Sequence, residues 1–129
     1  MEAKNDMINK ATVTKQVKEI FNVPYGQDGI YCEPSMEDIC KAINDNTLEH
    51  RGFQSDIEEL RKEWYIVETG RYDYGLIKKY HAERIAYFVV NGIGDPIYLK
   101  DDGKTISDGL HRLKAAIFKG YDHIEVVNK

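Results

Sequence analysis

The chain has 129 residues, of which 42% are hydrophobic and 31% charged, and its formal net charge at pH 7 is −4. This length suits one domain with a real hydrophobic core, and no apolar run reaches the length of a membrane span, so no membrane partner is expected. The two cysteines, Cys32 and Cys40, match no zinc-ligand spacing, which indicates reduced thiols in a cytoplasmic protein.

The charge is distributed unevenly along the chain. Residues 1–72 contain 14 acidic and 9 basic residues, whereas residues 73–129 contain 8 acidic and 9 basic residues. Because nucleic-acid binding depends on neutralising backbone phosphates, this acidic first part does not favour DNA as a partner. A set of basic residues in the second part keeps local DNA contact open. Its members are Lys78, Lys79, Arg84, Arg112, Lys114 and Lys119.

The start of the chain predicts a helix over residues 12–21. Four apolar residues would share one face of that helix: Val13, Val17, Ile20 and Phe21. Pro24 would end it, since proline disfavours helix in the residue before it. Residues 25–33 contain two glycines and predict a loop or a short hairpin.

Two further helices are predicted before residue 63. Ser35 precedes a helix that runs to about Asn44, with three residues facing inward: Ile39, Cys40 and Ile43. Ser55 and Glu58 have the reciprocal spacing of a capping box, so a helix is expected from there to about residue 62.

Residues 64–68 have the composition of a strand, and Asp73 is expected to cap the longest helix, which runs to about Val90. At 100° per residue, the apolar face of this helix contains Ile77, Ile85 and Phe88. His81 and Arg84 fall within the same arc, while Lys79, Glu83 and Ala86 lie opposite. A buried arginine needs a partner or a ligand. Arg84 is therefore either a ligand-binding residue or one side of a salt bridge, to Asp95 or Asp108. For His81 the alternative to a site role is a core histidine bonded to a backbone carbonyl.

The remainder predicts a strand, a hairpin turn and a second strand over residues 96–106. A helix at 109–119 and a last strand at 123–127 follow. Gly120 suits the position just after a helix. We therefore expect an α+β fold, a small mixed sheet flanked by helices. Residues 1–62 would form an N-terminal helical extension, and residues 63–129 the main domain.

The most informative segment is residues 107–116, Ser-Asp-Gly-Leu-His-Arg-Leu-Lys-Ala-Ala. A strand there stops at Asp108-Gly109 and a helix starts at once, with His111 and Arg112 in its first turn. The first amides of a helix lack intrahelical acceptors and suit an anion such as phosphate. The alternative is structural: Asp108 caps the helix and the two basic side chains lie in water.

A family resemblance bears on this choice. The run from Asp95 to Val127 reads DPIYLKDDGKTISDGLHRLKAAIFKGYDHIEVV and resembles the core of the ParB/sulfiredoxin superfamily. The spacing Gly109-x-x-Arg112-x-x-Ala115 is similar to the signature with which ParB-type domains hold nucleotide phosphates. Residues 81–85 and 91–97 look like small ParB-like proteins of phages and mobile elements. Sulfiredoxins have a nucleophilic cysteine where this chain has Leu110, so peroxiredoxin repair is not expected.

The resemblance implies a nucleoside di- or triphosphate, such as CTP or ATP, bound with Mg²⁺. Its phosphates would lie against residues 108–112, with Gly109 and Leu110 giving backbone access and Arg112 as clamp, and with Arg84 or His81 completing the pocket. Asp108 would hold the metal, and His111 would act as an acid or base if the nucleotide is hydrolysed. Binding without turnover is the other option.

Two other functions remain open from the sequence. The acidic first 72 residues favour a non-catalytic protein that binds or inhibits a host factor, with the fold as a scaffold. The family resemblance also includes ParB-like nucleases, although the net charge opposes this reading. Four tyrosines are candidates for base stacking, with packing as the more ordinary use: Tyr72, Tyr74, Tyr98 and Tyr121.

Overall fold

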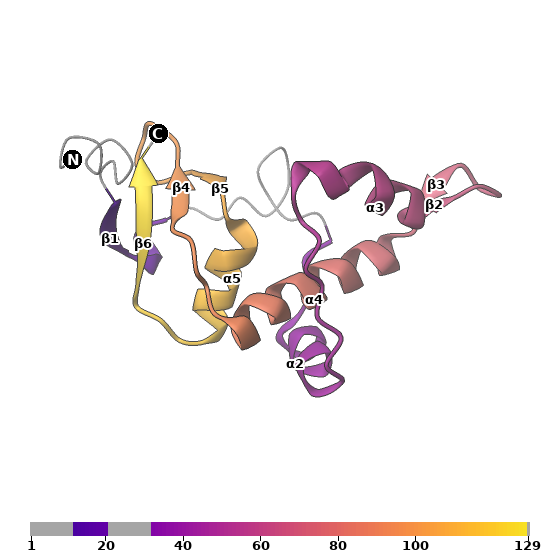
Figure 1. Cartoon of the computed structure of the whole chain (residues 1–129), viewed down its shortest axis with the longest axis horizontal. Coiled ribbons are helices and arrows are strands. Elements are labelled where there is room, and N and C mark those ends of the chain that lie inside the picture. The colour runs from indigo at the N-terminus through magenta and orange to yellow at the C-terminus, as the bar shows by residue number, and fades with distance from the viewer. Residues whose placement is uncertain (1–11, 21–31, 129) are drawn as a thin grey trace.

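The computed structural model describes residues 12–20 and 32–128 (Figure 1). One end of the molecule is a four-stranded sheet in the order β1-β6-β4-β5. The strands are β1 (Thr12–Gln16), β4 (Ile97–Leu99), β5 (Ile106–Asp108) and β6 (His123–Asn128). β6 pairs antiparallel with β1 and parallel with β4, and β4 pairs antiparallel with β5. The expected α+β fold with a mixed sheet is confirmed.

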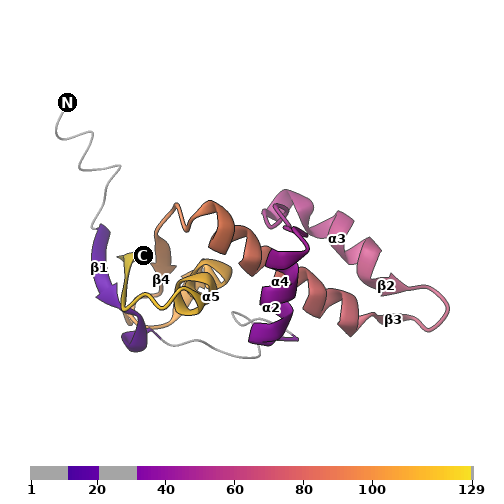
Figure 2. The same cartoon turned by 90° about the horizontal axis from the view of Figure 1, so that it is seen from below.

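The helices of the described residues extend away from this sheet, except for the last one, which packs against it (Figures 1 and 2). They are α2 (Met36–Asn44), α3 (Ile57–Trp64), α4 (Tyr74–Asn91) and α5 (Leu110–Phe118), with short 3-10 turns at Val17–Glu19 and Gln54–Asp56. α4 runs from the sheet end to the opposite end, where β2 (Tyr65–Ile66) and β3 (Arg71–Tyr72) form a two-stranded hairpin. Asp73 caps α4 as predicted, because its Oδ1 accepts hydrogen bonds from the amides of Gly75 and Leu76.

Two hydrophobic clusters hold the fold together, and α5 contributes to both. The first packs the sheet against α5, with Ile97, Leu99, Leu113 and Val126 almost fully buried. The second joins α2, α4 and α5 around Ile39, Ala82, Ile85, Ala86 and Ala115. Ile20 belongs to the first cluster and Ile39 to the second, so the predicted N-terminal part and the main domain are packed together.

The predicted helix over residues 12–21 is wrong in the part that the structure describes. Thr12–Gln16 form strand β1, which pairs with β6 along five residues. β-Branched Thr12, Val13 and Thr14 lose side-chain freedom in a helix and suit a strand. The open edge of β6 decides the outcome, because it accepts the hydrogen bonds of this segment. Most of the predicted loop at 25–33 lies outside the described residues.

Smaller corrections concern helix positions in the middle of the chain. Ser35 caps α2 with Asp38 in a reciprocal pair, but Cys40, expected inward, is exposed. Ser55 is not a cap: it lies inside a 3-10 turn whose capping carboxylate is Asp56, which accepts from the amides of Gly52 and Phe53. The strand expected at 64–68 is reduced to two residues, because Trp64 ends α3.

The helical wheel of α4 predicts the burial of Arg84 correctly and that of Ala86 wrongly. Arg84 is buried as expected, but Ala86, placed on the opposite side, is fully buried as well. The reason is that α4 packs between α2 and α5, so it has apolar neighbours on more than one side. A single-sided wheel assumes only one packed face.

Candidate functional site

The segment from β5 to α5 makes the sharp corner that the sequence predicts. Gly109 is the N-cap of α5 with φ +104°, a conformation that favours glycine, and its carbonyl accepts a hydrogen bond from the amide of Leu113. Asp108 ends β5 and does not cap the helix, since α5 has no side-chain cap. A Cβ at Gly109 would lie 2.7 Å from Nη2 of Arg112. Glycine therefore suits the positive φ of the turn and leaves room for this guanidinium.

Arg112 folds back over the corner instead of extending into solvent. Its Nη2 donates a hydrogen bond of 3.2 Å to the carbonyl of Pro96 and lies 3.8 Å from the carboxylate of Asp108. The Arg112 side chain is only 14% exposed, whereas that of Asp108 is 69% exposed. The buried Nε of Arg112 has no hydrogen-bond partner among the described residues. The guanidinium thus keeps an unused donor.

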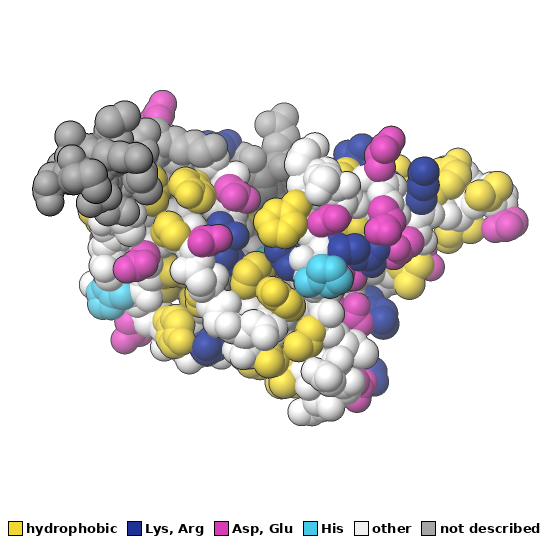
Figure 3. Space-filling view, viewed as in Figure 1, with side chains coloured by type: hydrophobic (Ala, Val, Ile, Leu, Met, Phe, Trp, Pro, Cys, Tyr) yellow, Lys and Arg dark blue, Asp and Glu magenta, His cyan; other side chains and the backbone are white. Residues whose placement is uncertain are grey.

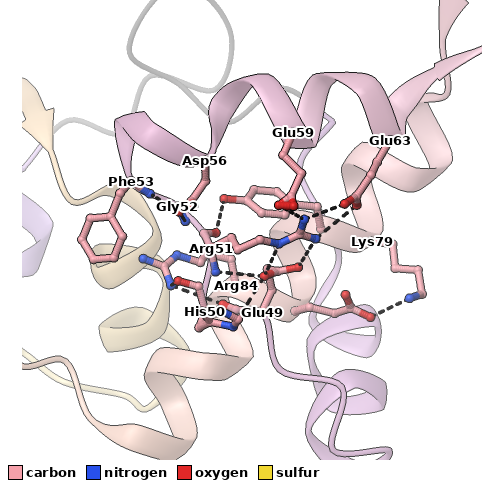
Figure 4. Close-up of polar contacts among 12 residues, drawn as sticks. Glu49, His50, Arg51, Gly52, Phe53, Asp56, Glu59, Glu63, Lys79 and Arg84 are labelled. Carbon is pink, nitrogen blue, oxygen red and sulfur yellow. Dashed lines mark hydrogen bonds and ion pairs between the residues drawn. The ribbon is translucent and has the colours of Figure 1, made fainter.

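Arg84 approaches from α4 and holds the loop before α3 (Figure 4). Its Nη1 donates to the carbonyls of Glu49 at 3.2 Å and His50 at 2.8 Å. Gly52 gives the guanidinium room, since a Cβ there would lie 2.5 Å from Nε. Within the described residues, Arg84 forms no salt bridge with Asp95 or Asp108, the two partners that the sequence suggests. Arg84 is 7% exposed and uses neutral carbonyls instead of a carboxylate.

The two arginines meet at one aromatic ring. The guanidinium carbon of Arg84 lies 4.5 Å from the centroid of Phe88, and that of Arg112 lies 6.0 Å from the same centroid. Aromatic faces attract cations, and this interaction strengthens when water is excluded. Burial lowers the pKa of Arg84, and the charge of Arg112 acts in the same direction. Positive charge is therefore concentrated here. The exposed carboxylate of Asp108 lies 3.8 Å from Nη2 of Arg112, and the charge of Glu49 acts on the pKa of Arg84 in the opposite direction.

His81 and His111 lie beside the arginines and face each other. Nδ1 of His81 is 2.9 Å from Nε2 of His111, and their rings stack at 5.1 Å. Burial lowers the pKa of His111 well below 6.5, and the charges of His81, Arg84 and Arg112 lower it further. His111 is therefore neutral at pH 7. Nδ1 of His81 is therefore engaged with a second imidazole.

The structure brings most of the predicted site residues together. Arg84, Arg112, His81, His111 and Gly109 form one cluster, which we call the arginine cluster. Leu110 is half-buried and packs against both hydrophobic clusters, and Asp108 lies at the edge with its carboxylate in solvent. Within residues 12–20 and 32–128, no group of three or more His, Cys, Asp or Glu side chains is placed to hold a metal ion.

Two aromatic residues that sequence reasoning did not assign to the site lie next to it. Phe88, predicted only as part of an apolar face, is the ring shared by both guanidinium groups. Phe53 follows Gly52 in the loop that Arg84 holds, and it is 68% exposed (Figure 4). No local motif marks Phe53, since its proximity depends on a contact between residues 52 and 84. Tyr72 and Tyr74 instead lie at the β2–β3 end of α4.

Comparison with known proteins finds no matching family model, no matching curated protein and no matching solved structure. The resemblance to the ParB/sulfiredoxin superfamily therefore stays a prediction from the sequence. In the described ranges, no helix combines the length and apolar character needed to cross a membrane.

Proposed function

We propose that this protein binds the phosphate groups of a nucleotide at the arginine cluster. The observation that carries the proposal is the pair of arginines over Phe88, one buried and one 14% exposed. Their guanidinium groups donate to backbone carbonyls, and among the described residues their ion pair is with the exposed carboxylate of Asp108, at 3.8 Å. Uncompensated charge in the interior is costly. A bound anion would offset that cost, and planar guanidinium groups bind phosphate oxygens in pairs.

The corner at Gly109 supports the same ligand. It places the free amides at the start of α5 beside Arg112, and the positive end of the helix dipole favours an anion at this point. The helix end alone would be weak support, because most helix ends bind nothing but water. Its combination with Arg84 and Arg112, which come from different elements, makes phosphate the best-fitting group.

Phe53 favours a nucleotide over free phosphate. Its exposed ring adjoins the loop that Arg84 holds, so a base could stack on it while the phosphates contact the arginines. Stacking of a base on an aromatic side chain contributes about 1–3 kcal/mol and tolerates all bases. CTP and ATP, with or without Mg²⁺, are the ligands that the family resemblance implies.

The test is calorimetric titration of the protein with CTP, ATP and pyrophosphate, each with and without Mg²⁺. We expect Arg112→Gln to weaken all three about tenfold or more, since charge-assisted hydrogen bonds contribute about 1.5–3 kcal/mol. Lys119→Gln is the matched control, because this cation also belongs to the α5 region but lies at its other end. Phe53→Ala should weaken the nucleotides and leave pyrophosphate unchanged. The proposal fails if wild type binds none of them, or if both cation variants have the same effect.

A further inference from the structure

The β2–β3 hairpin exposes apolar side chains far from the arginine cluster. Five large apolar residues between 65 and 76 are 42% to 78% exposed: Tyr65, Val67, Tyr72, Tyr74 and Leu76. They make up nearly half of the exposed large hydrophobic residues in the described ranges, so the exposed apolar side chains are concentrated in this segment of the chain. The hairpin protrudes at one end of the molecule (Figure 1), and hydrophobic side chains gather on the surface at that end (Figure 3). Concentrated apolar surface of this kind marks interaction sites.

Two of these residues, Tyr65 and Tyr72, lie side by side on the hairpin. Tyr65 and Tyr72 are direct cross-strand partners, and their rings contact edge to face at 5.6 Å. Val67 follows β2 in the turn of the hairpin and is 78% exposed. A two-stranded hairpin without packing on a core is marginal in water. Such a pair of exposed tyrosines offers an amphipathic contact surface of the type enriched in protein interfaces.

An acidic cavity continues this surface. A cavity of about 230 Å³ at the base of the hairpin is lined by Leu76 and Trp64 together with Glu49, Glu63 and Glu83. Arg51 occupies its wall and contacts three glutamates, Glu63 at 2.6 Å, Glu49 at 2.9 Å and Glu59 at 3.2 Å (Figure 4). Three carboxylates share one guanidinium, which leaves this group of four side chains with a charge of −2. Glu83 pairs separately with Lys79.

We propose that the hairpin side bearing Tyr65 and Tyr72, together with the adjoining acidic cavity, binds a partner protein segment that combines apolar residues with an arginine or lysine. The apolar part would cover Tyr65, Val67 and Tyr72. The cation would lie at Glu59 and Glu63, which are 60% and 49% exposed and therefore accessible. At protein interfaces, truncating a central aromatic side chain typically lowers the affinity more than truncating a side chain at the rim.

Charge argues against a second copy of this chain as the occupant. A two-fold dimer through this side would bring the two acidic groups toward each other, and like charges across an interface suppress association. A segment with a cation complements the same surface. The two tyrosines and the excess of carboxylates thus select one kind of partner.

Selection from a library of random short peptides tests this proposal. The peptides are selected on the wild-type protein and counter-selected on the double variant Tyr65→Ser, Tyr72→Ser. We expect the retained peptides to be enriched in arginine or lysine next to apolar residues. Synthetic copies of them should lose about tenfold or more in affinity with the double variant or with Glu63→Lys. Ile117→Ser, which removes an exposed apolar residue from α5, should change affinity less than about twofold.

Three results would overturn the proposal. They are retained peptides without basic residues, affinities that do not change in the Tyr65/Tyr72 variant, and hairpin-dependent self-association of wild type in sedimentation. The variants replace exposed side chains, and their circular dichroism spectra report whether they fold. Arg112→Gln should bind the peptides like wild type, so failure here is distinct from failure of the nucleotide proposal.

Discussion

The contact between Gly52 and Arg84 makes a quantitative prediction about stability. Gly52→Ala would put a methyl group 2.5 Å from Nε and 2.8 Å from Cζ of a guanidinium that is buried and hydrogen-bonded. The end of a free arginine would move aside at little cost. This one holds the carbonyls of Glu49 and His50, so moving it breaks those two bonds.

The size of the effect follows from these bonds. A hydrogen bond from a charged group contributes about 1.5–3 kcal/mol, and the two carbonyls can recover part of this from water because His50 is exposed and Glu49 half-buried. We expect Gly52→Ala to cost about 2–4 kcal/mol. In an Arg84→Leu background the obstructing atoms are gone, and the same change should be neutral or stabilise by up to about 1 kcal/mol.

Urea unfolding of the wild type, the two single variants and the double variant measures this coupling. The expected coupling free energy between positions 52 and 84 is about 2 kcal/mol or more, well above the scatter of independent sites. The reasoning is refuted if Gly52→Ala costs the same, within about 0.5 kcal/mol, in both backgrounds. Such additivity would mean that Arg84 does not hold the loop against Gly52.

Two further predictions concern the corner at α5 and the histidine pair. Gly109→Ala and Gly120→Ala both place alanine at a positive φ, but only the new methyl group at position 109 meets a neighbouring atom, Nη2 of Arg112 at 2.7 Å. In urea unfolding, Gly120→Ala should lower the free energy of unfolding by about 1–2 kcal/mol, and Gly109→Ala should lower it clearly more. Equal losses would contradict the contact with Arg112. The pKa of His111 is lowered in the folded state, so the unfolded chain binds more protons below pH 6.5 and stability falls as the pH decreases from there. His111→Gln should flatten this dependence below pH 6.5, and an unchanged slope in pH-dependent thermal unfolding would count against a neutral histidine in the folded state.

Local patterns determined much of this fold. The sequence correctly predicted three positions at helix ends and the order of the elements after residue 96, because a cap or a turn depends on residues a few positions apart. The three positions are Asp73 before α4, Ser35 before α2 and Gly120 after α5. The burial of Arg84 also followed from the period of its own helix.

The tertiary structure decided what depends on distant neighbours. β1 is a strand because β6 offers it an edge, and Ala86 is buried because α4 lies between two helices. The partners of Arg84 are carbonyls about 35 positions earlier, and His81 meets His111 across 30 positions. Periodicity records only the side of an element on which a residue lies. Which other element faces that side is decided by packing of the whole chain, and the arginine cluster and the exposed hairpin both arise at that level.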